Sequence, residues 1–215
     1  MRPRIADPRL KSLYNRLFRY YGPQRWWPAD SAWEMMVGAL LTQNTSWTNV
    51  VTALGKLKKA KALAPKSIAA MPLRRLQKLI RSSGYFRQKS HRLKGFAQAV
   101  LKNPRLIHRR ADLLAQHGVG PETADSILLY ATHQPFFVVD AYTRRLGHRL
   151  GWFKTNDYDQ VQSFFQDRLA RDPALYNEYH ALIVRLAKEV CRSRDPRCGE
   201  CPVQTVCAHG RSQRS

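Results

Sequence analysis

The chain has 215 residues, with 37 lysines and arginines against 15 aspartates and glutamates, which gives a formal net charge of +22. Hydrophobic residues make up 44% of the sequence, enough for a packed interior, and this excludes a disordered basic tail. No apolar run approaches the roughly 20 residues of a membrane span. The first residues, Met-Arg-Pro-Arg-Ile-Ala-Asp, lack the apolar stretch of a signal peptide. We therefore expect a cytoplasmic protein of one or two domains without a membrane anchor.

The predicted elements are helical almost throughout. Apolar residues from Leu10 to Tyr21 recur at helical spacing, and Gly22-Pro23 ends that segment. Ser31 and Glu34 form a capping box before a second helix that ends near Gln43. Further helices are expected at about 46–61, 72–82, 87–101, 109–116, 121–132, 141–150, 158–170 and 173–190. A short β-prone run at 136–139 is present, but no segment alternates as a half-buried strand does, so the sequence predicts an all-α protein.

The positive charge is concentrated in one part of the chain. Between Glu34 and Asp112 lie 77 residues with no acid and with 17 lysines or arginines. A surface with one sign of charge repels itself unless a polyanion neutralises it, so this stretch predicts a nucleic-acid partner. An anionic membrane surface is the alternative, but no basic amphipathic helix with an exposed apolar face accompanies the charge.

All four cysteines fall in the last 25 residues, with the spacing C-x6-C-x2-C-x5-C at Cys191, Cys198, Cys201 and Cys207. In a reducing compartment such clustering favours metal ligation over disulfides. Zinc ribbons usually offer two short Cys-x2-4-Cys pairs, and only Cys198 with Cys201 qualifies. One compact loop with unequal spacers fits a cubic iron-sulfur cluster better, with zinc as the alternative.

A second motif joins two helices within residues 111–128 through Gly118-Val119-Gly120. Glycines permit positive φ and close backbone approach, and N–H groups at a helix start can hold a phosphate. A plain helical hairpin with glycine caps is the alternative. A Val-Val-Asp run ending at Asp140 follows about 20 residues later and adds a carboxylate near the same surface.

Together these motifs resemble the helix-hairpin-helix (HhH-GPD) DNA glycosylases of the endonuclease III superfamily. Leu-Leu-Thr-Gln-Asn-Thr at 40–45 is similar to the family's Leu-x-x-Gln helix end. The resemblance implies a two-lobed, all-α fold: a six-helix barrel domain at 31–135, and a second domain from 1–30 plus 136–215 with a 4Fe-4S cluster loop at 191–207. It also implies a monomer that binds double-stranded DNA containing damaged bases, with the flipped base in the cleft between the lobes.

The resemblance also assigns roles to single residues. Bifunctional members carry, two residues after Gly-Val-Gly, a lysine that forms a Schiff base, and this chain has Glu122 there. We therefore expect a monofunctional enzyme without lyase activity, in which Asp140 stabilises the oxocarbenium-like sugar and activates water. From sequence alone Asp140 could also be a helix N-cap, and the two roles are compatible. Gln43 would fill the gap left by the flipped base, and Gly118, Val119 and Gly120 would contact DNA.

The base pocket is predicted at Trp26, Trp27, Trp47 and Glu122. With Gly-Tyr-Phe-Arg-Gln-Lys at 84–89, these residues resemble the 3-methyladenine DNA glycosylase III branch. Electron-rich rings attract a cationic alkylated purine, so we expect excision of bases such as 3-methyladenine in base excision repair. The cluster motif is more typical of the endonuclease III branch, so oxidised or deaminated pyrimidines are the alternative substrates. A non-catalytic iron-sulfur DNA-binding protein is the alternative from another class.

Overall fold

Helices dominate residues 5–212, the part of the chain that this computed structural model describes. Within those residues no strand forms, and the one β-type pairing is an isolated bridge between Ile5 and Leu169. The all-α prediction is therefore confirmed. None of the described helices has both the length and the apolar composition required to span a membrane. The first four residues, part of the stretch in which no signal peptide was predicted, lie outside the described residues.

Twelve α-helices and five shorter turns follow one another along the described chain. The α-helices are α1 (Pro8–Tyr21), α2 (Ala32–Thr42), α3 (Trp47–Lys59), α4 (Pro65–Ala70), α5 (Leu73–Leu79), α6 (Phe86–Lys102), α7 (Arg110–Leu114), α8 (Pro121–Ser126), α9 (Ala141–Leu150), α10 (Tyr158–Gln166), α11 (Pro173–Glu189) and α12 (Ala208–Ser212). Four of these short helical turns are 3-10 helices, η1 (Arg81–Ser83), η2 (Pro104–His108), η4 (Cys198–Glu200) and η5 (Gln204–Val206), and η3 (Ile127–Ala131) is a π-helix. The helices α4 and α12 were not predicted, because six and five residues are too few to show a helical period.

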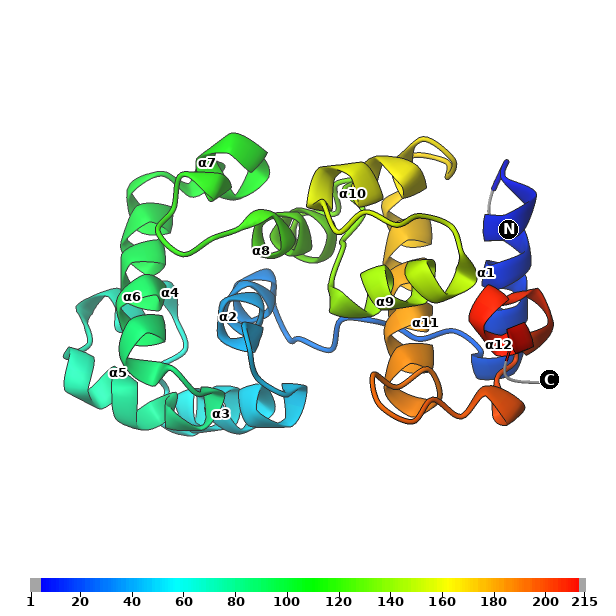
Figure 1. Ribbon diagram of the computed structural model, residues 1–215. Helices are drawn as coiled ribbons and strands as arrows, with labels where there is room; N and C mark the ends of the chain where they lie inside the picture. Colours follow the sequence, from blue (N-terminus) through cyan, green and yellow to red (C-terminus); the bar gives the residue numbers. More distant parts are fainter. Residues whose placement is uncertain (1–4, 213–215) are drawn as a thin grey trace. The chain divides into compact units, whose positions relative to one another are not determined.

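The chain divides into two compact units (Figure 1). One unit is continuous and runs from Trp27 to His133, so it contains α2 to α8 and η3. The other unit combines the described parts of Met1–Trp26 and Gln134–Ser215, with α1 and α9 to α12.

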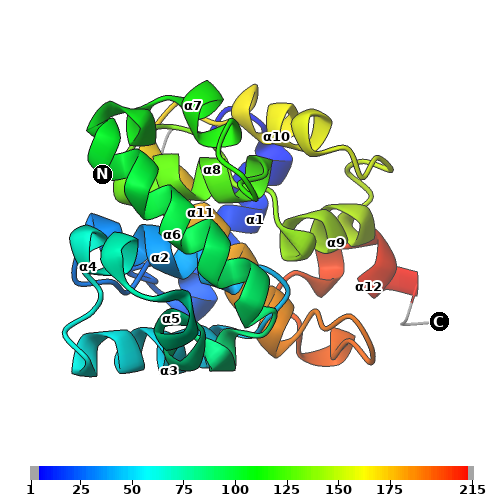
Figure 2. The ribbon, with the colours of Figure 1, turned by 90° about the vertical axis from the view of Figure 1, so that its left-hand side faces the viewer.

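Helix α2 is the buried centre of the Trp27–His133 unit. Every residue from Glu34 to Leu41 is buried, because the helix packs against α3, α6, α8 and η3. Ser31 caps its start by accepting a hydrogen bond from the Glu34 N–H at 3.2 Å. The Glu34 carboxylate accepts from the Asp30 N–H at 3.2 Å. Helix α6 crosses the unit alongside α4 (Figure 2).

A buried lysine joins the end of α2 to the turn before α6. Lys89 is 3% exposed, and its ammonium donates to the carbonyls of Leu41 at 2.9 Å and Ser83 at 2.6 Å. Burial, assisted by the positive charge of Arg92, lowers the pKa of Lys89 to about 8.

Aromatic rings fill the core of the discontinuous unit. Phe137 and Phe165 stack with their centroids 4.2 Å apart, and the Tyr179 hydroxyl donates to the Leu10 carbonyl of α1 at 2.9 Å. The β-prone run that contains Phe137 forms no strand, because side chains of α10 form hydrogen bonds with its backbone. Gln166 accepts from the Phe137 N–H at 2.9 Å, and Gln162 donates to its carbonyl at 2.7 Å.

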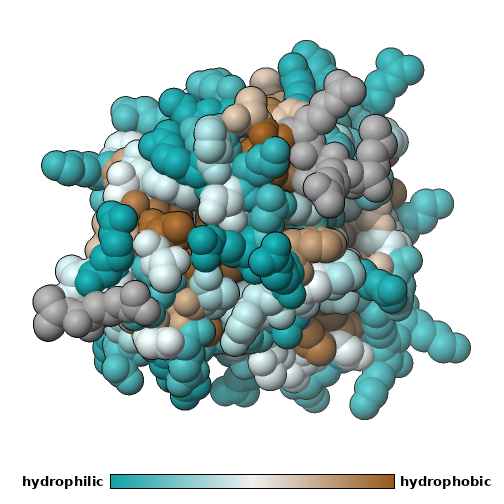
Figure 3. Space-filling view, turned by 90° about the vertical axis from the view of Figure 1, so that its right-hand side faces the viewer, coloured by the Kyte–Doolittle hydropathy of each residue, from teal (hydrophilic) through white to brown (hydrophobic). Residues whose placement is uncertain are grey.

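Figure 3 shows the face that carries α1 and α12, where hydrophilic side chains predominate and the apolar patches are small and separate.

Candidate functional site

The predicted hairpin consists of α7, the turn around Gly118-Val119-Gly120, and α8. Gly118 has φ +80°, a left-handed conformation that strongly favours glycine, and an added Cβ would collide with the Arg92 side chain. Gly120 has φ −92°, and an added Cβ would meet no protein atom within 4 Å. The backbone conformation therefore favours a glycine at 118, whereas the conformation at 120 is open to other residues.

A buried ion pair clamps the two helices of the hairpin together. The Arg110 guanidinium donates to both carboxylate oxygens of Asp125, Nε to Oδ1 at 2.7 Å and Nη2 to Oδ2 at 3.1 Å. The Asp125 side chain is fully buried, and that of Arg110 is 27% exposed. This two-point contact fixes α7 on α8 and with it the turn between them.

Gln43, predicted to enter the DNA, is tied to the hairpin in this structure. Its Nε2 donates to the Gly118 carbonyl at 2.9 Å and to the Thr123 hydroxyl at 3.0 Å, and its Oε1 accepts from Arg92 Nη1 at 3.1 Å. To fill a gap in a duplex the side chain has to exchange these contacts for DNA. The hydrogen bonds link the end of α2 to the turn of the hairpin.

Two of the predicted pocket tryptophans meet in the Trp27–His133 unit. Trp27 and Trp47 lie edge to face with centroids 4.8 Å apart, and Tyr130 lies 5.3 Å from Trp27. A Cβ added to Gly38 of α2 would lie 3.5 Å from both tryptophan rings, an ordinary van der Waals distance, so the rings lie close to the backbone of this helix. Because the two tryptophans touch each other, a base would stack on an outer face of this cluster rather than between them.

Trp26 belongs to the other unit and already has a cation above its ring. The Lys188 ammonium lies 5.8 Å from the Trp26 centroid and 5.9 Å from that of Tyr142. A cationic base would meet a like charge at this position. Adjacent tryptophans in the sequence therefore have different surroundings.

Asp140 is the N-cap of α9, as the sequence allowed. Its Oδ1 accepts a hydrogen bond from the Thr143 N–H at 2.7 Å. Its Oδ2 lies 3.4 Å from His180 Nε2, and the side chain is 14% exposed. His180 lies on α11, is buried, and was not predicted as a site residue. The sequence gives no signal for it, because a lone histidine within the apolar run of a helix is typical of a core position.

The charge of Asp140 is set by opposing effects. Burial opposes ionisation, but the attraction of His180 and the hydrogen bonds from His180 and Thr143 outweigh it, so the pKa of Asp140 is lowered. The carboxylate is therefore ionised at neutral pH although water reaches little of it.

Glu122 lies in the first turn of α8 and is exposed.

The four cysteines lie in the loop after α11. Cys191 and Cys207 are buried, and Cys198 and Cys201 are partly exposed. Burial, together with the nearby thiols of the other three cysteines, raises the pKa of Cys201 to about 11. The other three thiols therefore lie close enough to Cys201 to affect its pKa. Among residues 5–212, however, no three histidine, cysteine or acidic side chains gather closely enough to hold a single metal ion.

Two arginines of α9 form hydrogen bonds with this loop. Arg145 Nε donates to the Cys191 carbonyl at 2.9 Å, and Arg149 Nη1 donates to the Arg192 carbonyl at 2.6 Å and lies 3.2 Å from Cys191 Sγ. The Gly210 N–H donates to Cys207 Sγ at 3.4 Å. Donors to sulfur of this kind stabilise thiolates.

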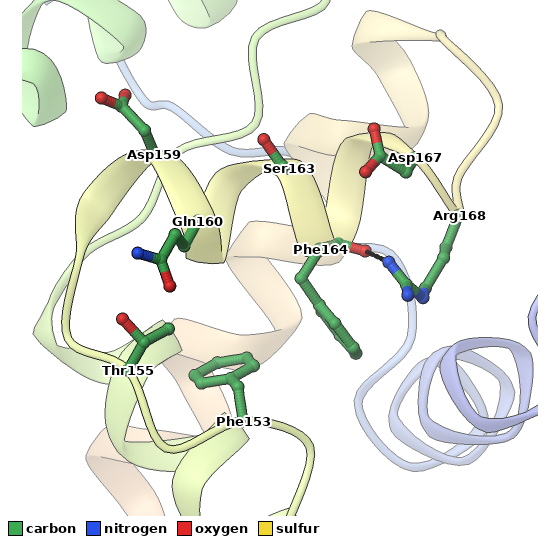
Figure 4. Close-up of a pocket in the computed structure, with 8 residues that line it drawn as sticks. All are labelled: Phe153, Thr155, Asp159, Gln160, Ser163, Phe164, Asp167 and Arg168. Carbon is green, nitrogen blue, oxygen red and sulfur yellow. Dashed lines mark hydrogen bonds between the residues drawn. The ribbon is translucent and has the colours of Figure 1, made fainter.

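An open pocket of about 530 Å³ lies along α10, away from the predicted site residues (Figure 4). Phe153 and Phe164 line it, with Asp159 on α10, Asp167 at the C-terminal end of that helix, and Arg168 beside them. The two carboxylates would repel a phosphate backbone.

Comparison with known proteins places this geometry in a family. A profile of the HhH-GPD superfamily of base excision DNA repair proteins matches residues 37–171. The chain belongs to this superfamily. A Methanocaldococcus jannaschii protein, provisionally named a DNA repair glycosylase, is 42% identical over 207 residues, which are 91% of this chain and 94% of the relative.

Two solved HhH-GPD structures are similar to this one. The crystal structure of H. pylori 3-methyladenine DNA glycosylase bound to 1,N6-ethenoadenine has a TM-score of 0.73 at 31% identity, with 84% of this chain and 95% of that chain covered. A trapped endonuclease III–DNA covalent intermediate has a TM-score of 0.86 at 20% identity, with 96% and 97% covered, and shares the fold.

Membership in the superfamily confirms the predicted helix-hairpin-helix glycosylase fold. It also confirms an enzyme of DNA repair that acts on N-glycosyl bonds, with DNA as its partner.

Proposed function

We propose that this HhH-GPD protein is a monofunctional DNA glycosylase that removes alkylated purines such as 3-methyladenine from duplex DNA. The observation that carries the proposal is Asp140, a carboxylate that stays ionised although its side chain is only 14% exposed. An anion with little water around it is suited to stabilise a cation that develops on the sugar.

The chemistry assigned to Asp140 is hydrolysis. The bond between C1′ and the base nitrogen breaks, and its electron pair leaves with the base, which turns an alkylated cationic purine into a neutral molecule. Asp140 stabilises the positive charge that remains on the sugar, and the oxygen of a water molecule then bonds to C1′. Asp140 accepts the proton that this water loses. Because the leaving base is already activated by its charge, no strong general acid is required.

The aromatic cluster supports a cationic substrate. Trp27 and Trp47 are partly exposed, and the faces of such rings attract a positive charge without a particular set of hydrogen bonds. The buried Tyr130 packs against Trp27. An oxidised or deaminated pyrimidine is neutral and would be recognised mainly by hydrogen-bonding groups. The H. pylori 3-methyladenine glycosylase, similar in sequence and fold, agrees with this choice.

Glu122 supports the proposal that the enzyme lacks lyase activity. A carboxylate cannot form an imine with the sugar aldehyde, and Glu122 stands at the position of the lysine nucleophile. Hydrolysis by water is then the route that this site supports.

The cysteine loop supports a 4Fe-4S cluster held by Cys191, Cys198, Cys201 and Cys207. In a cubane the four thiolates bind four different irons, and the other three thiols lie close enough to Cys201 to raise its pKa. A bound cluster would crosslink the loop and make it rigid. Arg192, Arg194 and Arg197 of the same loop would then face a phosphate backbone.

Base release from defined duplexes tests the function. Duplexes carrying 3-methyladenine, 7-methylguanine, uracil or thymine glycol are incubated with the protein, and free bases are identified by mass spectrometry. We expect release of the alkylated purines and no covalent adduct with borohydride. Release of thymine glycol but no alkylated purine, or efficient trapping, would move the protein to the oxidised-pyrimidine class.

Matched variants separate catalysis from capping. Asp140→Asn should lower excision by orders of magnitude with little loss of stability. Asp157→Asn is the control, because Asp157 caps α10 with the same geometry, accepting from the Gln160 N–H at 2.8 Å, but is exposed. Trp47→Ala should weaken excision of the cationic base more than Trp26→Ala does, because Lys188 already occupies the Trp26 ring. If Asp140→Asn and Asp157→Asn lower the excision rate equally, Asp140 does not have the catalytic role proposed for it. If Trp47→Ala and Trp26→Ala lower it equally, the aromatic cluster does not bind the base as proposed.

A further inference from the structure

The carboxylate of Asp140 has a different neighbour at each oxygen. Oδ1 is held by the Thr143 N–H of its own helix, at 2.7 Å. Oδ2 lies 3.4 Å from the imidazole Nε2 of His180, which comes from α11. The imidazole is buried, with its side chain 5% exposed, and the Phe137 ring lies edge-on to it with centroids 6.4 Å apart. The helix start therefore fixes one oxygen, and a titratable ring on another helix faces the second.

Binding of DNA makes the ionised carboxylate harder to maintain. A bound duplex removes more water from Asp140 and brings negatively charged phosphates near it, and both effects favour the protonated carboxyl. A protonated Asp140 could neither stabilise a cation nor accept a proton from water. The proposed activity therefore needs a group that keeps the charge on Asp140 when solvent is excluded.

The titratable and charged groups around the pair identify that group. On α9, Tyr142 lies next to Asp140, and its pKa is raised by burial and by the charge of Asp140. Arg145 of α9 and Lys188 of α11 lie over the Tyr142 ring, at 5.2 Å and 5.9 Å from its centroid. The group whose charge acts on Asp140 itself is His180.

We infer that His180 is a positioning residue for Asp140, which keeps the carboxylate ionised and holds its Oδ2 in place while DNA covers the site. This role rests on the proposed function of Asp140. His180 does not touch the substrate in this scheme, and it acts through the aspartate alone.

A titration by NMR tests the pair without any activity. The carboxyl carbons of uniformly labelled protein are followed through the acidic range, and the Asp140 resonance is assigned by its loss in Asp140→Asn. We expect the wild-type midpoint below the ordinary aspartate value of 3.8. We expect it to rise by about 1 pH unit or more in His180→Gln, which removes the charge. A wild-type midpoint at or above 3.8 overturns the inference even if the variant does not fold.

The pH dependence of excision tests the same pair in the enzyme. Single-turnover release of 3-methyladenine is measured from about pH 4 to about pH 8 for the wild type and His180→Gln. We expect the acidic limb of the profile to move to higher pH by about 1 unit in the variant. A lowered plateau with an unmoved acidic limb would mean that His180 is only part of the core, and would overturn the inference.

The control is His148→Gln. His148 lies on α9, the helix that Asp140 caps. Its Nε2 contacts the Thr155 carbonyl at 2.9 Å rather than a carboxylate. Its replacement should leave the acidic limb unmoved. If the wild type releases no base from any duplex but the NMR midpoints behave as expected, the proposed function fails and the Asp140–His180 pair stands.

Discussion

The ion pair between Arg110 and Asp125 offers a direct test of how the hairpin is held. Replacing Arg110 by methionine keeps most of the length of the side chain and removes the guanidinium. The variant leaves a fully buried carboxylate without the two hydrogen bonds, at 2.7 Å and 3.1 Å, that neutralise it. Removing one partner of a buried pair costs about 3–5 kcal/mol. Because Arg110 is 27% exposed, we expect the lower end of that range, about 3 kcal/mol.

The assay is urea denaturation followed by circular dichroism at neutral pH. Arg109→Met is the matched control, because Arg109 pairs with Asp112 at 3.5 Å through a side chain that is 71% exposed. We expect a loss below about 1 kcal/mol for this neighbour.

A double variant refines the interpretation. Arg110→Met combined with Asp125→Leu removes both charges, so it should recover much of the stability that the single change loses. A loss below about 1 kcal/mol in Arg110→Met, or a double variant in which the two losses add, would refute the view that the buried pair clamps α7 on α8.

The remaining predictions concern the hairpin turn, the buried lysine and the cysteine loop. Gly118→Ala should cost about 1–2 kcal/mol in urea denaturation, because its φ is +80°. Gly120→Ala should leave stability unchanged and weaken DNA binding in a filter assay; equal stability losses would contradict the turn geometry. Between pH 8 and pH 10.5 the wild type should gain stability relative to Lys89→Met, since the unfolded chain still holds a proton that the folded chain has released. A difference that stays flat with pH would contradict burial of the ammonium. Anaerobically purified protein should contain about four irons per chain, and Cys198→Ser should lower iron content and folding yield together; stoichiometric zinc would refute the cluster.

The sequence was sufficient for the features that depend on neighbours along the chain. Helical spacing of apolar residues located α1, and the Ser31 cap of α2 was predicted from one short motif. Asp140 was expected both as a cap and as the carboxylate that stabilises the sugar cation, and the structure shows the cap, with the N–H of Thr143 as its donor. Local hydrogen bonds leave a local pattern, which explains why they can be predicted.

The features that depend on distant residues were not predictable in this way. The contact between His180 and Asp140 joins two helices, and no spacing in the sequence indicates it. The contacts of Gln43 with Gly118 and Thr123 likewise depend on how α2 packs against the hairpin. Trp26 and Trp27 are adjacent, yet Trp26 lies beside Lys188 and Trp27 packs against Trp47, so their positions in the sequence did not indicate their surroundings.

Helix α9 connects the proposed chemistry with the cysteine loop. Asp140 caps its first turn, and Arg145 and Arg149, farther along the same helix, hold the backbone at Cys191 and Arg192. A rigid loop therefore gives α9 fixed anchor points, and a rigid helix transmits that constraint to the backbone N–H that orients Asp140. A cluster bound by the cysteines would in this way affect catalysis through geometry. This effect would not require any contact between the cluster and the substrate.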